Sequence, residues 1–149
     1  MIFTHQQPSW ELYHQCFPKI NKGEENGSAG NNAIWTMCSI TNKNENENEN
    51  ENKNENKNEN DIGFYTMYKF TKNKYVLFNF AIYEHYRGHG YSHLILDYII
   101  NTYVEKNNDI YLFVETSNKI AYNLYIKHGF KVVKDFVAPT GSITMKLIH

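Results

Sequence analysis

A strand, a glycine-rich turn, a helix and a second strand follow one another between residues 74 and 116, and this segment constrains the fold most. The runs KYVLFNFAIY (74–83) and DIYLFVET (109–116) are mostly apolar, which is typical of strands buried on both faces of a sheet. A helix expected from about Gly90 to Glu105 places leucine, isoleucine and tyrosine side chains on one broad face. Because a strand that returns through a helix lies parallel to the strand before it, we expect a parallel βαβ unit at the centre of the fold.

The rest of the chain predicts a mixed sheet with helices on both faces. The expected order is strand, helix, three strands, helix, strand, helix and two strands, so the fold class is α/β (α+β). The further patterns, in chain order, are an amphipathic helix at 8–17, strands at 33–40 and 62–70, a short helix at 117–130 and two closing strands at 131–148.

A low-complexity tract occupies residues 42–60, where asparagine stands at every even position and glutamate or lysine at every odd one. Neither face of this pattern is apolar, so ordering the tract would cost conformational entropy without burying anything. We expect one domain over residues 1–149, with the tract as a disordered loop that expands a hairpin between two strands. The alternative is that the tract is an interaction module on an inert scaffold.

Composition excludes several classes of partner and location. The 15 Lys and Arg residues nearly balance the 16 Asp and Glu residues, so we expect neither a nucleic-acid nor a membrane partner. Cys16 and Cys38 are too few for a disulfide framework or a zinc cluster, and their apolar surroundings are typical of inert buried thiols. No basic leader and no apolar run of bilayer length is present, so we expect a soluble protein of the cytoplasm, with the nucleus left open.

The turn between the first buried strand and its helix, HYRGHGYSHL at 85–94, concentrates groups that could hold an anion. Glycine permits positive φ, and the first N–H groups of a helix are unpaired at the positive end of its dipole. A backbone phosphate site with Arg87 as an added cation is one interpretation, and a plain strand-to-helix turn is the other. It is not a Walker loop, because no Gly-Lys-Ser/Thr follows, and it lacks the third glycine of the dinucleotide fingerprint.

Three histidines in this region, His85, His89 and His93, recur every four residues. Only His89 and His93 can share a helix face, and no cluster of further ligands accompanies them. We therefore expect no metal site.

Two motifs in this half of the chain resemble those of the GNAT superfamily of N-acetyltransferases. Arg87-x-x-Gly90-x-Ser92 is similar to the family's acyl-CoA pyrophosphate motif, Arg/Gln-x-x-Gly-x-Gly/Ala, with serine at the last small position. The resemblance covers roughly residues 75–131 and implies a mostly antiparallel mixed sheet whose parallel strand pair splays apart to admit the pantetheine arm. The second motif has the spacing N-x-x-A-x-x-x-Y-x-x-x-G-F and comprises Asn118, Ala121, Tyr125, Gly129 and Phe130.

The resemblance also implies the ligands and their contacts. Acetyl-CoA is the expected cosubstrate and an amine the expected acceptor. By position, the expected acetyl-CoA contacts are Phe80, Ile82 and Glu84 through the backbone, then Arg87, Gly88, His89, Gly90, Tyr91 and Ser92 at the phosphates, and Asn118 and Tyr125 on the following helix.

In this family a neutral amine attacks the acetyl thioester directly, and the leaving thiolate needs a proton. Tyr125 is the expected acid, because it lies two helical turns after Asn118 and shares its face. Asn79 is the expected second catalytic residue, ordering a water that relays the proton of the amine. Ribosomal-type N-terminal acetylases tend to carry glutamate where this chain has Phe113, so the resemblance does not support that substrate class.

The sequence leaves the identity of the general base open. Glu84 and Glu115 are the nearest carboxylates in the sequence, and a solvated or structural role is the alternative for both. The missing base supports a second hypothesis, an acyl-CoA-binding protein of the same fold without catalytic activity. The acceptor stays open between small-molecule and peptide amines, and the oligomeric state between monomer and homodimer.

Overall fold

The structure, a computed structural model, describes residues 1–26, 32–40 and 60–149. The order of strands and helices is the one predicted from the sequence, with a short 3-10 turn added before the second helix. None of the helices in these residues combines the length and the hydrophobicity that spanning a bilayer requires. The elements are β1 (Ile2–Thr4), α1 (Trp10–Cys16), β2 (Ala33–Ser39), β3 (Asp61–Thr71), β4 (Lys74–Ile82), η2 (Glu84–Tyr86), α2 (Tyr91–Val104), β5 (Asp109–Glu115), α3 (Lys119–Lys127), β6 (Phe130–Val133) and β7 (Ser142–Leu147).

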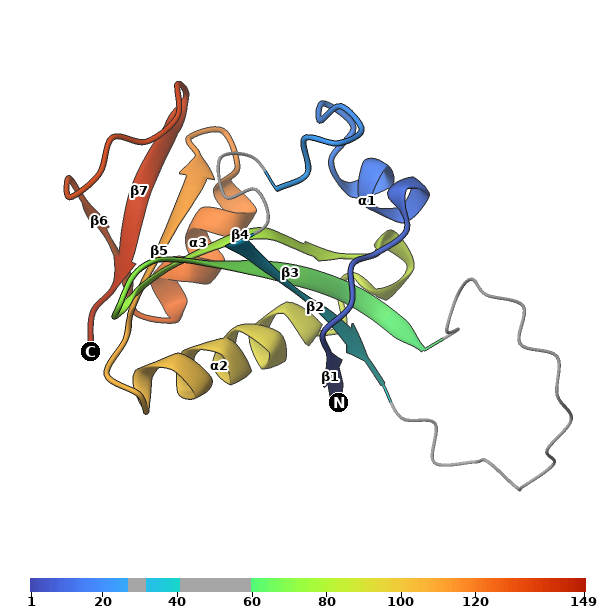
Figure 1. Ribbon diagram of the computed structural model, residues 1–149, viewed down its shortest axis with the longest axis horizontal. Helices are drawn as coiled ribbons and strands as arrows, with labels where there is room; N and C mark the ends of the chain where they lie inside the picture. The colour runs from blue at the N-terminus through green and yellow to red at the C-terminus, as the bar shows by residue number, and fades with distance from the viewer. Residues whose placement is uncertain (27–31, 41–59) are drawn as a thin grey trace, which may run out of the picture.

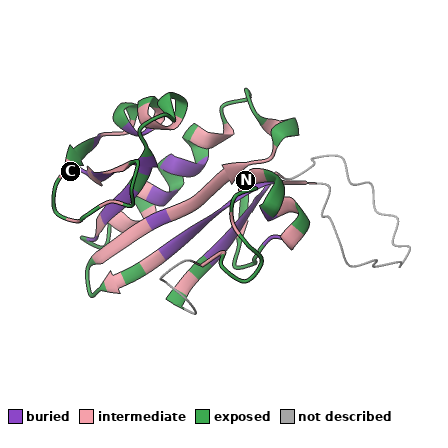
Figure 2. Ribbon diagram, turned by 90° about the horizontal axis from the view of Figure 1, so that it is seen from above, coloured by how far each residue is buried: buried purple, intermediate pink, exposed green. Residues whose placement is uncertain are grey.

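Within the described residues seven strands form one sheet in the order β1-β2-β3-β4-β5-β7-β6. The β4–β5 pair is parallel and the other pairs are antiparallel, which confirms the predicted mixed sheet. Helix α1 covers one face of the sheet, and α2 and α3 lie against the other (Figure 1). Within the described residues, two hydrophobic clusters follow this division, a large one under α2 and α3 and a smaller aromatic one under α1. Buried positions recur along the strands of the sheet (Figure 2).

The parallel strands β4 and β5 stay together for only part of their length. Their register runs from Lys74 opposite Asp109 to Leu77 opposite Leu112. Strand β5 continues to pair with β7 as far as Glu115. The second half of β4 therefore leaves β5, and the predicted splay is confirmed.

A β-bulge in β4 accompanies the splay. Thr66 of β3 pairs with Phe78 and Phe64 pairs with Ala81, so β4 carries one residue more than β3 between these pairs. Asn79 has φ 52, in the left-handed region that asparagine tolerates better than most residues. The extra residue bends β4 away from the plane it shares with β5.

The side chain of Asn79 is held from three directions. The Tyr13 hydroxyl donates to its Oδ1 at 3.0 Å. Its Nδ2 donates to the Glu25 carbonyl at 2.8 Å and to Thr66 Oγ1 at 3.3 Å. These bonds attach α1 and the segment after it to the bulge, so the position of α1 depends on Asn79.

Residues 42–59 of the predicted low-complexity loop lie outside the described residues. The strands on either side, β2 and β3, are antiparallel neighbours, as expected of a hairpin. Ser39 lies opposite Asp61, and the Ile40 N–H donates to the Asn60 carbonyl at 2.9 Å. The tract therefore connects two chain ends that the sheet already holds together.

Replacing residues 41–59 by Asn-Gly is expected to raise the free energy of unfolding by about 2 kcal/mol, because a two-residue turn loses less chain entropy on closure. Urea unfolding measures the change. A variant with a Gly/Ser segment of the original length is the control and is expected to match the wild type. Lower stability in the shortened protein would contradict the proposal that the tract is a dispensable insertion in one domain.

Candidate active site

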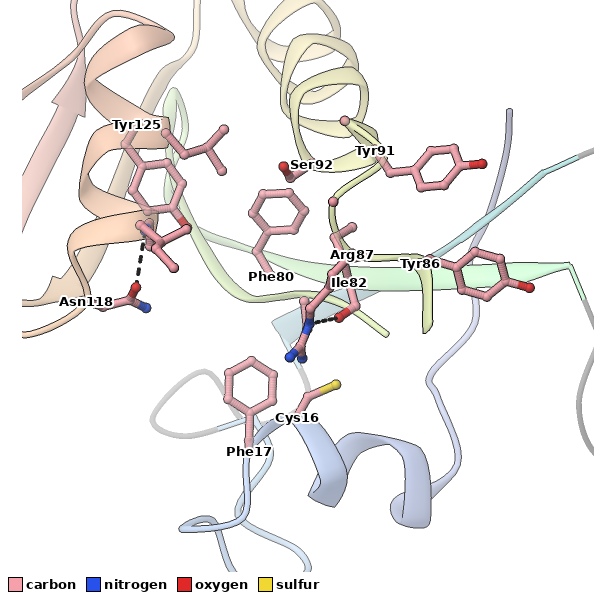
Figure 3. A pocket seen from close by; sticks show the side chains of 16 residues that line it. Cys16, Phe17, Phe80, Ile82, Tyr86, Arg87, Tyr91, Ser92, Asn118 and Tyr125 are labelled. Carbon is pink, nitrogen blue, oxygen red and sulfur yellow. Dashed lines mark hydrogen bonds between the residues drawn. The ribbon is translucent and has the colours of Figure 1, made fainter. Parts of the chain in front are cut away.

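A cavity of about 580 Å³ opens where β4 leaves β5. Its walls come from the end of α1, the second half of β4, the turn before α2 and the side of α3 that carries Leu124 and Tyr125 (Figure 3). The residues that line it are Cys16, Phe17, Phe80, Ala81, Ile82, Tyr86, Arg87, Gly88, Gly90, Tyr91, Ser92, Asn118, Ile120, Ala121, Leu124 and Tyr125.

The turn before α2 offers a row of free backbone N–H groups. Gly88 and Gly90 both have φ +80, a conformation that glycine adopts without strain. The helix hydrogen bonds begin with the N–H groups of His93 and Leu94, which donate to the Gly90 carbonyl at 3.2 and 3.4 Å. The N–H groups of residues 88–92 have no backbone partner in the described part of the chain. This arrangement at a helix N-terminus suits a phosphate group.

Helix α3 presents two polar groups to the cavity. Asn118 caps the helix, with its Oδ1 accepting the Ala121 N–H at 3.1 Å. Tyr125 packs edge-on against Phe130 with ring centroids 5.7 Å apart. The Tyr125 hydroxyl has no hydrogen-bond partner among the described residues, and the side chain extends toward the cavity (Figure 3). It is therefore free to bond a ligand.

Burial keeps the Tyr125 phenol protonated. The residue is only 9% exposed, and burial raises the pKa of its hydroxyl to about 12. At neutral pH the group holds a proton that it can donate into the cavity.

The raised pKa of Tyr125 predicts a loss of stability in alkali. Between about pH 10 and 12 the unfolded chain loses the phenolic proton while the folded chain keeps it, so the free energy of unfolding falls as pH rises through this window. Tyr125→Phe is expected to show a smaller fall, measured by urea unfolding at about pH 9 and pH 11.5. Tyr13 and Tyr103, whose pKa burial also raises to about 12, titrate in both proteins and cancel. An equal fall in the two proteins would contradict the assignment.

The structure brings most of the expected acetyl-CoA contacts to this cavity. Glu84 and His89 are exposed and do not line it. Asn79 does not line it either, because its amide is engaged at the bulge, and its catalytic role stays a prediction. The predicted residues that line it are Phe80, Ile82, Arg87, Gly88, Gly90, Tyr91, Ser92, Asn118 and Tyr125.

No carboxylate lines the cavity among the described residues. Glu115 is exposed at the end of β5, and Glu84 is exposed in η2. The structure therefore assigns neither residue as a general base.

Several lining residues were missed from the sequence, chiefly Cys16 and Phe17 from α1 and Ile120 and Leu124 from α3. The α3 residues carry a usable signal, since they lie one turn apart on the side that holds Tyr125. No sequence signal identifies Cys16 and Phe17, because their position at the cavity depends on how α1 packs against the sheet.

Cys16 departs from the inert buried thiol that its sequence context predicted, whereas Cys38 fits that description. Cys38 is fully buried, and burial raises its pKa to about 12. Cys16 is half-buried and lines the cavity. Burial raises the pKa of Cys16 as well, and the Arg87 guanidinium beside it opposes that rise.

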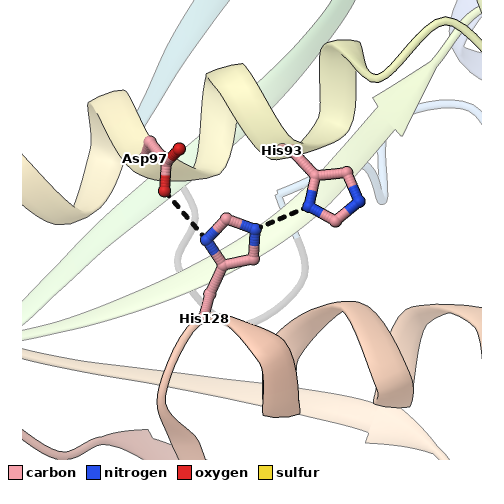
Figure 4. A network of polar contacts seen from close by, with 3 residues as sticks. All are labelled: His93, Asp97 and His128. Carbon is pink, nitrogen blue, oxygen red and sulfur yellow. Dashed lines mark hydrogen bonds and ion pairs between the residues drawn. The ribbon is translucent and has the colours of Figure 1, made fainter.

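Polar contacts join the start of α2 to the end of α3 (Figure 4). His128 Nδ1 lies 2.9 Å from Asp97 Oδ1, and His128 Nε2 lies 2.8 Å from His93 Nδ1. When His128 donates its Nδ1–H to Asp97, its Nε2 accepts the Nδ1–H of His93. These bonds fix the spacing of two helices that both line the cavity. Across the described residues no group of three or more His, Cys, Asp or Glu side chains is arranged to hold a metal ion.

The chain was compared with protein families, with functionally curated proteins and with solved structures. Residues 10–130 match the model of the acetyltransferase (GNAT) family. No functionally curated protein matches the chain significantly. Many solved structures share the fold at low identity.

Three of these structures illustrate the similarity. The ribosomal-protein-S18-alanine N-acetyltransferase from Escherichia coli is 16% identical with a TM-score of 0.69, over 98% of this chain and 92% of that one. A GNAT family acetyltransferase from Elizabethkingia anophelis with acetyl-CoA bound is 14% identical with a TM-score of 0.68, over 95% and 91%. The PaiA N-acetyltransferase from Thermoplasma acidophilum in complex with coenzyme A is 14% identical with a TM-score of 0.59, over 93% and 87%.

Proposed function

Because this chain belongs to the GNAT acetyltransferase family, we propose that it transfers an acetyl group from acetyl-CoA to a primary amine of a small molecule or a peptide. One observation carries the proposal. The free N–H groups before α2, the splayed edge of β4 and the Tyr125 hydroxyl all meet at one cavity. These are the groups needed to hold a phosphate, to bind an amide-containing arm and to supply a proton.

The residues present fit acetyl-CoA. The N–H groups of residues 88–92 and the positive end of the α2 dipole suit its pyrophosphate. The edge of β4 that has left β5 offers backbone groups to the amides of its pantetheine arm. Phe80 and Leu124 supply apolar walls beside that path. The E. anophelis and T. acidophilum proteins, which share this fold, have acetyl-CoA and coenzyme A bound.

Tyr125 and Asn118 have different roles in the proposed reaction. When bound, acetyl-CoA supplies an activated thioester and leaves as a thiol. Tyr125 holds a proton on its hydroxyl at the cavity, and in this proposal it donates that proton to the leaving sulfur. Asn118, whose Oδ1 is fixed by the Ala121 N–H, orients its amide at the cavity.

The second candidate function rests on the missing base. The amine must be neutral to attack, and no carboxylate lines the cavity among the described residues to take its proton. A cavity without such a carboxylate is what we expect of a protein that binds acyl-CoA but does not catalyse transfer.

Two measurements on the purified protein separate the candidates. Acetyl-CoA is expected to raise the melting temperature by binding to the folded state, and a panel of primary amines is expected to include one that releases free CoA. A raised melting temperature with no release on any amine favours the binding protein. If neither occurs, both candidates are wrong.

A further inference from the structure

Asn79 has a left-handed backbone inside strand β4. Among the described residues only Asn79 (φ 52) and Asn107 (φ 55), which lies in the turn after α2, have positive φ without being glycine. Such a backbone inside a strand persists where the surroundings hold it in place. At Asn79 the surroundings act through the side-chain amide.

The amide of Asn79 connects β4 to three other parts of the chain. It accepts the Tyr13 hydroxyl of α1 at 3.0 Å, and it donates to the Glu25 carbonyl at 2.8 Å and to Thr66 Oγ1 of β3 at 3.3 Å. Tyr13 is 2% exposed, and burial raises the pKa of its hydroxyl to about 12, so the phenol keeps the proton that it donates. Helix α1 has only 7 residues and is too short to be stable alone, so its position depends on packing and on these bonds.

These bonds join two walls of the cavity. Cys16 and Phe17, at the end of α1, form one wall and follow Tyr13 by about one helical turn. Phe80, the residue directly after Asn79, lies on the other wall. Figure 3 shows Phe17 and Phe80 on opposite sides of the cavity. The separation of the α1 and β4 walls therefore depends on the amide of Asn79.

We propose that Asn79 is a positioning residue for acetyl-CoA, whose amide keeps α1 and the bulged strand β4 at the separation that admits the pantetheine arm. This rests on the proposed function. Within the described chain the bonds of the amide run to α1, to the segment after it and to β3, and none runs to the turn before α2. Asn79 is therefore expected to govern binding of the arm and not of the pyrophosphate. The water relay expected from the sequence would instead need an amide that lines the cavity, which this one does not.

The test compares a ligand that has the pantetheine arm with one that lacks it. Asn79→Gly tolerates the left-handed backbone and removes only the amide. Calorimetry is expected to show a Kd for acetyl-CoA about 10-fold weaker than that of the wild type, the loss expected for one or two hydrogen bonds. The Kd of 3′-phospho-ADP, the nucleotide half of the cosubstrate, is expected to change less than about twofold, because it uses only the turn before α2. All measurements are made at a temperature at which the melting curve shows each variant to be folded.

Two further variants control the comparison. Asn107→Gly makes the same replacement at the other asparagine with positive φ, which does not line the cavity, and is expected to match the wild type for both ligands. Tyr13→Phe removes the α1 end of the link and is expected to weaken acetyl-CoA alone. Combining it with Asn79→Gly is expected to weaken acetyl-CoA no further than Asn79→Gly does, because both changes break the same bond.

The opposite pattern overturns the proposal. An equal loss of acetyl-CoA and 3′-phospho-ADP in Asn79→Gly, or no loss of either, shows that Asn79 does not position the walls for the arm. If the wild type does not bind acetyl-CoA, the proposed function fails, and hydrogen exchange still tests the link. Asn79→Gly is expected to speed exchange of the amides of α1 and of residues 80–82 by about 10-fold relative to Asn107→Gly. Equal exchange in the two variants refutes the positioning role.

Discussion

Tyr125→Phe is expected to lower kcat for acetyl transfer by about 100- to 10,000-fold, the range usual for loss of a general acid. The hydroxyl is the only group removed, and the ring keeps its edge contact with Phe130. No hydrogen bond to another described residue is lost, because the hydroxyl makes none. The dissociation constant of acetyl-CoA is therefore expected to stay within about threefold, so the defect appears in kcat. Steady-state CoA release with the best amine, together with calorimetry of acetyl-CoA, measures both.

Tyr122→Phe is the matched control for this prediction. Tyr122 lies on the same helix, is half-buried and does not line the cavity. Its variant is expected to keep the wild-type kcat. An unchanged kcat in Tyr125→Phe, or an equal loss in the two variants, would remove Tyr125 from the role of acid.

The parts of the fold that could be predicted from the sequence depend on local chemistry. The strand, turn and helix from Lys74 to Val104 follow from apolar runs and glycine placement, and their bounds match the structure within a few residues. The bulge at Asn79 has no such local signal. It depends on a register shift between β3 and β4 and on a bond from Tyr13, 66 residues away in sequence. The splay was expected from the family resemblance, and periodicity alone does not predict it.

The candidate site also combines residues that the local sequence identifies with residues that only the tertiary structure identifies. The turn at residues 87–92 and the face of α3 that holds Tyr125 each lie within one segment, so spacing identifies them. Cys16 and Phe17 enter from α1, which packs on the opposite face of the sheet from α2 and α3. The direction of the Arg87 side chain is also beyond the sequence, because it is set by a bond to the Ile82 carbonyl across the turn.

Gly63→Ala is expected to destabilise the protein by about 3 kcal/mol or more, because β3 and β4 approach too closely there for any side chain. A Cβ at Gly63 would lie 2.2 Å from the Ala81 carbonyl oxygen and 3.1 Å from the Ile82 Cα. Both are backbone atoms, so the strands must separate. Ala81 and Ile82 also form a wall of the cavity, so transfer activity is expected to fall with stability.

Urea unfolding of Gly63→Ala beside Gly23→Ala distinguishes this contact from a general effect of replacing glycine. Gly23 has φ +94, and a methyl group added there would meet nothing within 4 Å, so its variant meets only backbone strain, about 1 kcal/mol. Gly63 lies outside the positive-φ region, so its cost comes from the clash with β4. A Gly63→Ala protein within about 1 kcal/mol of wild type would mean that β4 moves freely at this point. The wall of the cavity after the bulge would then be adjustable, and the close approach of β3 would not be what sets its position.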